Sequence, residues 1–140
     1  MSDAVFADTN IYVYAAVANS GPKHCEASRV LADVLSSRRI ISSTQVLGEF
    51  YSAMSKNKCP HGEIIRLLDE IKFNTEMKVV DEQTVEHGLN LIAKYGYHYW
   101  DSLLLATALD YNCTVFYSED MRDDQVIEGM TIRNIFREAG

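Results

Sequence analysis

At 140 residues the chain has the length of one domain and is large enough to bury a core of its own. Apolar residues make up 47% of it and charged residues 24%, which matches globular proteins and argues against a disordered or fibrous chain. The formal net charge of −7 argues against a protein that holds long nucleic acid through a broad basic face, although a local basic patch or a bound metal could still do so.

The first half of the chain predicts alternating strands and helices. Residues 4–8 (AVFAD) predict a short strand that ends in a carboxylate, and the apolar run at 9–18 fits either a helix or an irregular segment. Apolar residues spaced three and four apart predict an amphipathic helix over 23–36. A brief strand is expected at 38–43, followed by a helix at 44–56 with three candidate N-caps, Ser42, Ser43 and Thr44.

The middle of the chain continues this alternation. Proline opens a predicted helix over 60–73, and residues 78–81 (KVVD) predict a short strand. A further helix follows and ends near Gly96. Its apolar face is expected to carry Val85, Leu89 and Ile92.

The last third supplies one helix and two strands. The run at 100–111 is almost wholly apolar after its second residue, which predicts a helix buried on most sides, and 113–120 predicts a strand that runs into acidic residues. A last short strand is expected at 130–136. Strands that alternate with helices indicate an α/β domain with a mainly parallel central sheet flanked by helices. In such sheets the ligand crevice lies beyond the carboxyl ends of the strands.

The cysteines, histidines and basic residues give no clear site. The three cysteines lack the spacing of a disulfide framework or zinc site, and are expected to be reduced: Cys25, Cys59 and Cys113. The histidines lack metal-ligand spacing and are assigned no chemistry: His24, His61, His87 and His98. The basic groups are more readily explained as solvated surface: Arg38 and Arg39, Lys56 and Lys58, and Arg122. Without a long apolar segment or a signal-like start, a cytoplasmic protein is expected.

Four carboxylates stand where the local pattern favours apolar residues or where a ligand crevice is expected. Asp8 closes the first strand, and Asp120 follows a later one. Glu49 falls on or beside the apolar stripe of its helix, and Asp101 begins the most apolar helix. A bare carboxylate in apolar surroundings is costly unless it is paired or bound to a metal.

Each carboxylate also has an ordinary structural explanation. Asp8 and Asp101 can be helix caps, because a short oxygen-bearing side chain accepts from exposed backbone N–H groups. Glu49 can point to the rim of its helix, and Glu119 and Asp120 can be turn residues. For one acid alone the structural explanation is the better one. The conjunction favours a shared site, since two acids end strands on the ligand side and two lie on helices that pack against the sheet.

Carboxylates that converge repel one another, and they persist only if a cation offsets the repulsion or if their pKa values rise. Mg²⁺ and Mn²⁺ take oxygen ligands from a few carboxylates and often bind substrate phosphate as well. The acidic set therefore indicates phosphate chemistry with a hard divalent ion.

Four segments resemble, in order and over almost the full length, the PIN-domain ribonucleases, and specifically the VapC-type toxins of bacterial toxin–antitoxin pairs. They are FADTNIYVY, STQVLGEFYSAM, YHYWDSLLLATAL and CTVFYSEDMRDDQ. Any one segment is a weak signal, but four at this spacing are a strong one. The resemblance implies a single PIN-like nuclease domain over residues 1–140 that hydrolyses RNA phosphodiester bonds with Mg²⁺ or Mn²⁺.

The resemblance also implies roles for individual residues. The catalytic metal ligands would be Asp8, Glu49, Asp101 and Asp120. The supporting polar residues would be Thr9, Asn10 and Ser118. Asp120 is preferred as fourth ligand because the family pattern is a hydroxyl residue, any residue, then Asp. The alternatives for that position are Glu119, Asp123 and Asp124.

The implied partners are an RNA substrate, a cognate antitoxin protein and a second copy in a homodimer, with no membrane partner expected. Aromatic residues that look exposed would suit a dimer surface, although core packing explains them at least as well: Tyr12, Tyr14, Phe50 and Tyr51.

Other functions remain open at this point. A phospho-acceptor signalling domain also binds Mg²⁺ at strand ends, but it would be expected to carry adjacent acids after the first strand, where this chain has only Asp8. A phosphatase with an aspartyl nucleophile would be expected to carry a second aspartate at position 10, where this chain has Asn10. A catalytically silent PIN-fold interaction module is the third possibility, and the intact acidic set would then have no evident use.

Overall fold

The computed structural model describes residues 3–136, so both ends of the predicted 1–140 domain, residues 1–2 and 137–140, lie outside the described residues. A six-stranded sheet runs through the centre in the order β3-β2-β1-β4-β6-β5. Neighbouring strands are parallel except for β5 and β6, which are antiparallel. The strands are β1 (Ala4–Ala7), β2 (Arg39–Ser43), β3 (Glu76–Lys78), β4 (Val115–Tyr117), β5 (Val126–Ile127) and β6 (Met130–Arg133).

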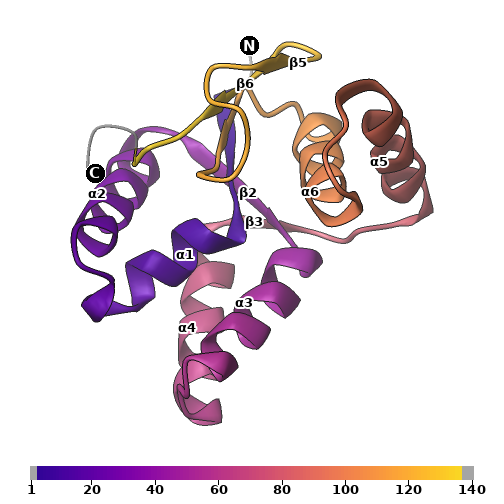
Figure 1. Cartoon of the computed structure of the whole chain (residues 1–140). Coiled ribbons are helices and arrows are strands. Elements are labelled where there is room, and N and C mark those ends of the chain that lie inside the picture. Colours follow the sequence, from indigo (N-terminus) through magenta and orange to yellow (C-terminus); the bar gives the residue numbers. More distant parts are fainter. Residues whose placement is uncertain (1–2, 137–140) are drawn as a thin grey trace.

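Helices cover both faces of this sheet, with α1 and α2 on one side and α5 and α6 on the other (Figure 1). They are α1 (Thr9–Ala16), α2 (Pro22–Ser37), α3 (Thr44–Lys56), α4 (His61–Asn74), α5 (Glu82–Tyr95) and α6 (Tyr99–Asp110), with one 3₁₀ turn, η1 (Ala18–Ser20). The predicted α/β fold class, with a mainly parallel sheet flanked by helices, is confirmed. Within residues 3–136, none of the helices is both long and apolar enough to span a bilayer.

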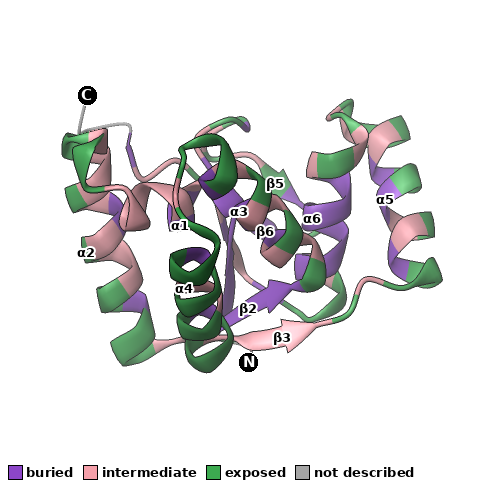
Figure 2. Ribbon diagram, turned by 90° about the horizontal axis from the view of Figure 1, so that it is seen from below, coloured by how far each residue is buried: buried purple, intermediate pink, exposed green. Residues whose placement is uncertain are grey.

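The core explains why α6 has no polar face. Every residue from Ser102 to Ala108 is buried, and the helix lies between α5 and the sheet, purple over most of its length in Figure 2. The central strand β1 is also fully buried, and Phe6 stacks on Phe116 of β4 with ring centroids 5.3 Å apart. A parallel strand with both faces covered is expected to be continuously apolar, as this one is.

The structure corrects two predictions in the middle of the chain. The third strand is Glu76–Lys78 and not 78–81, because the apolar Val79 that suggested a strand is exposed. On α5 the buried residues are Thr84, Gly88 and Leu91, whereas the predicted core residue Leu89 is 52% exposed. A Cβ atom at Gly88 would lie 3.4 Å from the Cα of Leu103, so the missing side chain lets α5 approach α6 closely.

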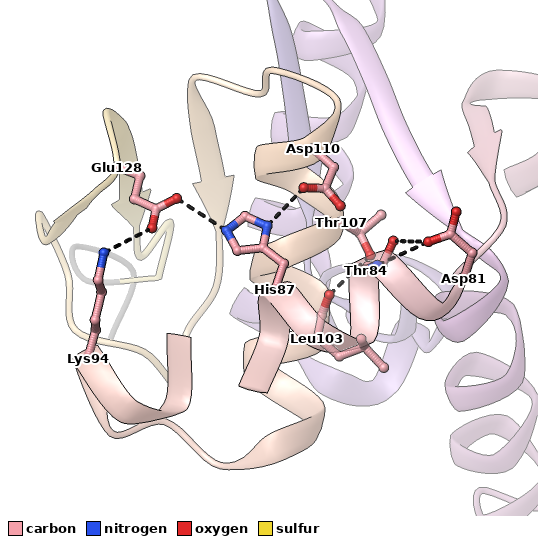
Figure 3. Close-up of polar contacts among 8 residues, drawn as sticks. All are labelled: Asp81, Thr84, His87, Lys94, Leu103, Thr107, Asp110 and Glu128. Carbon is pink, nitrogen blue, oxygen red and sulfur yellow. Dashed lines mark hydrogen bonds and ion pairs between the residues drawn. The ribbon is translucent and has the colours of Figure 1, made fainter. Parts of the chain in front are cut away.

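The hairpin of β5 and β6 was not predicted, because its turn is Glu128-Gly129 and not the usual Asn-Gly. Both residues have positive φ, 49° and 91°, as a two-residue hairpin turn requires. His87 of α5 lies between two carboxylates, with Nδ1 2.8 Å from Asp110 and Nε2 3.2 Å from Glu128 (Figure 3). Lys94 lies 3.7 Å from the same glutamate. These contacts tie the hairpin turn to α5 and α6.

The aromatic residues considered for a dimer surface belong largely to the core. Phe50 is 1% exposed and Tyr12 7%. Tyr14 and Tyr51 are half-buried and pack against the same cluster. Core packing, the alternative explanation, is the one that the structure shows for them.

Candidate active site

The carboxylates expected at the ligand side come from the ends of neighbouring strands. Asp8 directly follows β1, and its backbone N–H donates to the Tyr117 carbonyl at 2.9 Å, so it extends the pairing with β4. Ser118 directly follows β4, and Asp120 comes two residues later. Because β1 and β4 are adjacent and parallel, their carboxyl ends bring these residues to the same edge of the sheet.

Asp8 occupies the N-cap position of α1, but its side chain makes no capping hydrogen bond. Its Oδ2 instead accepts a hydrogen bond from the Ser118 hydroxyl at 3.1 Å. The Ser118 oxygen in turn accepts from the backbone N–H of Asp120 at 3.2 Å. Ser118 is fully buried and therefore connects the two acids beneath the surface of the site. The capping explanation for Asp8 does not hold.

Glu49 lies on α3 and points toward the start of α1. The Thr9 hydroxyl donates to its Oε1 at 2.6 Å, and Gln45, one turn earlier on α3, donates to its Oε2 at 3.0 Å. The same Gln45 amide donates to the carbonyl of Trp100 at 2.9 Å, which joins α3 to the first turn of α6. Glu49 is thus held between two elements and is not a free side chain at the helix rim.

Asp101 and Asp120 complete the set. The N-cap of α6 is His98, so Asp101 is not the cap, and its Oδ2 lies 2.9 Å from the His98 ring nitrogen Nε2. Asp120 is exposed and accepts a hydrogen bond from the Asn10 amide at 3.2 Å.

The charges of these acids act on one another. The pKa of Asp8 is raised from 3.8 to about 7, mainly by burial and next by the nearby charge of Asp101. Glu49 and Asp120 add to this rise, and the Ser118 hydrogen bond opposes it. Burial also raises the pKa of Asp101, whereas the nearby His98 ring lowers it. Four acids from four separate segments therefore lie within electrostatic reach of one another.

The acids do not form a preassembled metal cage. Among residues 3–136, no three His, Cys, Asp or Glu side chains are placed together as a ready group of metal ligands. Each carboxylate is instead held by a different polar partner: Ser118, Thr9 with Gln45, His98, and Asn10. The donor chemistry still fits a hard divalent ion, because the charges of three other carboxylates act on buried Asp8, whose ionised form is unfavourable without a cation.

The acids that competed with Asp120 have other contacts. Glu119 accepts from Tyr14 at 2.5 Å and from Lys23 at 2.7 Å. Asp123 accepts from the backbone N–H of Asn134 at 2.8 Å. Asp124 pairs with Arg133 of β6. Asp120 is the member of this group that shares Ser118 with Asp8.

Three residues at the site carry no assignment from the sequence. Gln45 lies four residues before Glu49, and His98 lies three residues before Asp101. Residues at these spacings are neighbours on a helix, so the spacing was the signal in the sequence that could have pointed to both. Trp100 precedes Asp101 and is 57% exposed, but nothing in the sequence distinguishes it from a core aromatic.

Comparisons with known proteins agree on the fold. The family model described as the PIN domain matches residues 5–127. No curated protein matches the chain significantly. Among solved structures, VapBC2 from Rickettsia felis bound to a DNA fragment from its promoter is similar with a TM-score of 0.71 and 20% identity, covering 94% of this chain and 98% of the other.

Two further structures are similar over most of their length. DNA-bound VapBC from Salmonella typhimurium has a TM-score of 0.69 and 18% identity, covering 96% of this chain and 99% of the other. VapC20 from Mycobacterium tuberculosis, described as a toxin that cleaves the sarcin–ricin loop, has a TM-score of 0.65 and 18% identity, covering 80% of this chain and 86% of the other. At these identities the likeness concerns the fold.

Proposed function

Because the chain belongs to the PIN domain family, we propose that it is a divalent-metal-dependent endoribonuclease and the toxin of a toxin–antitoxin pair. PIN domains are typically nucleases. The observation that carries the proposal is the buried carboxyl of Asp8, whose pKa is raised by burial and by the charges of three other acids, Asp101, Glu49 and Asp120. Such a set is costly in a structural role and useful in a metal site.

Mg²⁺ or Mn²⁺ is the proposed cofactor, in keeping with PIN nucleases, which generally use a divalent metal. When bound, the metal lowers the pKa of water and stabilises charge on the attacked phosphate and the leaving oxygen. The proposed ligands are Asp8, Glu49, Asp101 and Asp120, and what supports them is that the charges of the other three act on the buried Asp8 carboxyl.

The remaining polar residues would position these ligands. Ser118 holds one oxygen of Asp8 and leaves the other available. Thr9 donates to one oxygen of Glu49 and Gln45 to the other, which fixes the carboxylate and leaves each oxygen a second lone pair for a metal. Asn10 donates to one oxygen of Asp120. In the proposed reaction the oxygen of water bonds to the phosphorus of an RNA phosphodiester, one bridging P–O bond breaks, and the leaving oxygen takes up the proton that the water loses.

The proposed partner is an antitoxin protein. Similar structures were solved as toxin–antitoxin complexes from three organisms, Rickettsia felis, Klebsiella pneumoniae and Salmonella typhimurium. A toxin should arrest growth when it is expressed alone, and the Asp8→Asn variant should not. Unchanged growth on expression of the wild type would count against the toxin role but not against the nuclease.

The direct test is cleavage of a mixed RNA pool by the purified protein with Mn²⁺, with and without EDTA, followed by sequencing of the new ends. Asp8→Asn, Glu49→Gln and Asp101→Asn should each greatly reduce cleavage and leave the circular dichroism spectrum unchanged. Asp69→Asn, at an exposed acid on α4, is the matched control and should cleave like the wild type. Full cleavage by Asp8→Asn would refute this site, and no cleavage by the wild type would favour the silent interaction module.

A further inference from the structure

The turn after β4 carries two residues of the candidate site and, between them, one residue with other partners. Ser118 donates to Asp8 at 3.1 Å, and Asp120 accepts from Asn10 at 3.2 Å. Glu119 stands between Ser118 and Asp120 in the chain, and its side chain is only 15% exposed. Because the three residues are consecutive, whatever fixes Glu119 also fixes the residues on either side of it.

Glu119 is held by one residue from each of the first two helices. The Tyr14 hydroxyl of α1 donates to its Oε1 at 2.5 Å, and the Lys23 ammonium of α2 donates to its Oε2 at 2.7 Å. Both carboxylate oxygens therefore have a donor, and one of the donors carries the opposite charge. Hydrogen bonds between charged groups are shorter and stronger than those between neutral groups, so these contacts resist displacement of the turn.

The two donors are themselves held in place. The Tyr14 ring meets the Phe136 ring edge-to-face with centroids 5.2 Å apart, and the Tyr14 carbonyl lies 3.0 Å from Nδ1 of His24. The Lys23 ammonium lies 5.0 Å from the centroid of the Tyr14 ring and 5.5 Å from that of Phe136, within the range of cation–π attraction. Tyr14 and Lys23 are therefore preorganised toward Glu119.

Lys23 also departs from the charge pattern that its helix favours. It is the second residue of α2, where the positive end of the helix dipole favours acids and disfavours a cation. The carboxylate of Glu119 compensates for this unfavourable position. Since α2 itself gains nothing from a cation there, the contribution of Lys23 lies in its contact with the turn.

The contacts of the turn follow one face of α1. Asn10 and Tyr14 stand four residues apart on this helix and are neighbours on its surface, and they contact Asp120 and Glu119 respectively. We infer that Tyr14 and Lys23, acting through Glu119, are positioning residues of the candidate active site. They hold the turn after β4 against α1 and so place Asp120. The inference rests on the proposed function in that Asp120 is a proposed metal ligand, but the position of the turn can be measured without metal or RNA.

The first test measures the turn by NMR hydrogen exchange of the full-length protein in EDTA. The backbone N–H of Asp120 donates a hydrogen bond within the turn at 3.2 Å, so its exchange rate reports whether the turn is in place. Tyr14→Phe and Lys23→Gln should each speed this exchange about tenfold, whereas Lys23→Arg, which keeps the charge, should not. The N–H of Thr114 donates to the Ala4 carbonyl at the other end of β1 and β4, and its exchange should stay at the wild-type rate.

A second lysine–tyrosine pair provides the matched control. Lys78 of β3 lies 4.6 Å from the centroid of the Tyr111 ring. Lys78→Gln and Tyr111→Phe make the same chemical changes as Lys23→Gln and Tyr14→Phe, and they should leave exchange at Asp120 unchanged.

The second test measures metal affinity without RNA, from the electron paramagnetic resonance of free Mn²⁺. Tyr14→Phe and Lys23→Gln should each weaken Mn²⁺ binding about tenfold, as expected for residues that orient a ligand, and Lys23→Arg should restore it. In a protein that already carries Glu119→Ala, neither substitution should have a further effect, because both residues act through Glu119.

The outcomes separate this inference from the nuclease assignment. If Tyr14→Phe and Lys23→Gln leave Asp120 exchange at the wild-type rate, the inference is wrong and the nuclease is unaffected. Equal acceleration at Thr114, or faster Asp120 exchange with wild-type Mn²⁺ affinity, would also refute it, since the turn would then hold no ligand in place. Faster exchange confined to the turn, in a protein whose wild type neither binds Mn²⁺ nor cleaves RNA, would retain Tyr14 and Lys23 as the residues that position the turn and remove the metal site.

Discussion

Replacing Asp8 by asparagine should stabilise the metal-free protein, and by an amount that depends on pH. The Asp8 side chain is 6% exposed, and burial with the neighbouring charges raises the pKa of its carboxyl from 3.8 to about 7. Asparagine has nearly the same shape, and its carbonyl oxygen can accept the Ser118 hydrogen bond. The substitution therefore removes the charge and keeps the contact.

The size of the effect follows from the two pKa values. Below about pH 4 the carboxyl is protonated in the folded and the unfolded protein, so it does not affect the free energy of unfolding. Between pH 4 and pH 7 the unfolded chain ionises while the folded protein retains the proton. The wild type then loses about 1.4 kcal/mol of stability per pH unit. The total loss is about 4 kcal/mol by pH 7, and it stays constant at higher pH.

The assay is urea unfolding followed by circular dichroism in EDTA at several pH values. The stability of Asp8→Asn relative to the wild type should increase by about 2–3 kcal/mol between pH 5 and pH 8. Asp69→Asn, which also replaces one exposed acid by its amide, is the control for the substitution itself. Mn²⁺ at a hundredfold excess over its dissociation constant should stabilise the wild type by about 2.7 kcal/mol, and the variant by less. A pH-independent difference, or a variant less stable than the wild type at pH 8, would refute this reasoning.

Three further outcomes are expected. Gly88→Leu should destabilise the protein by about 1–3 kcal/mol or more in urea, because its side chain meets the Leu103 backbone, whereas Gly48→Leu in open space should not destabilise it. In EDTA, Ser118→Ala should raise the pKa of Asp8 above that in the wild type, because it removes the hydrogen bond that lowers this pKa, and an NMR titration that gave an unchanged or lower pKa would contradict the contact. Sedimentation at high micromolar concentration should detect a homodimer, and a monomer throughout would exclude it without affecting the nuclease.

The sequence was most informative where it broke its own local pattern. Asp8 after an apolar strand and Asp101 at the start of an apolar helix stood out because burial of an acid is costly. The structure places both, with Glu49, within reach of one another's charges. Their use as metal ligands stays a prediction.

Features that depend on packing between distant segments were not predictable in this way. The apolar face of α5 was misplaced because the close approach at Gly88 depends on α6, and periodicity alone favoured Leu89. The hairpin of β5 and β6 has a two-residue first strand and an unusual Glu128-Gly129 turn. His98 was assigned no role, because its spacing of three residues from Asp101 gains meaning only once Asp101 is known to face the site.

The central position of β1 has a consequence for synthesis of the chain. Its partner β2 is complete at Ser43, but its other partner, β4, ends only at Tyr117. At about 5–20 residues per second, a ribosome takes roughly 4–15 s to make the segment between them. During that time one edge of β1 has no strand to pair with, a state open to wrong association and to capture by chaperones. The hydrogen-bond donor to Asp8, Ser118, is also synthesised 110 residues later, so a chain stalled before that point has no assembled site.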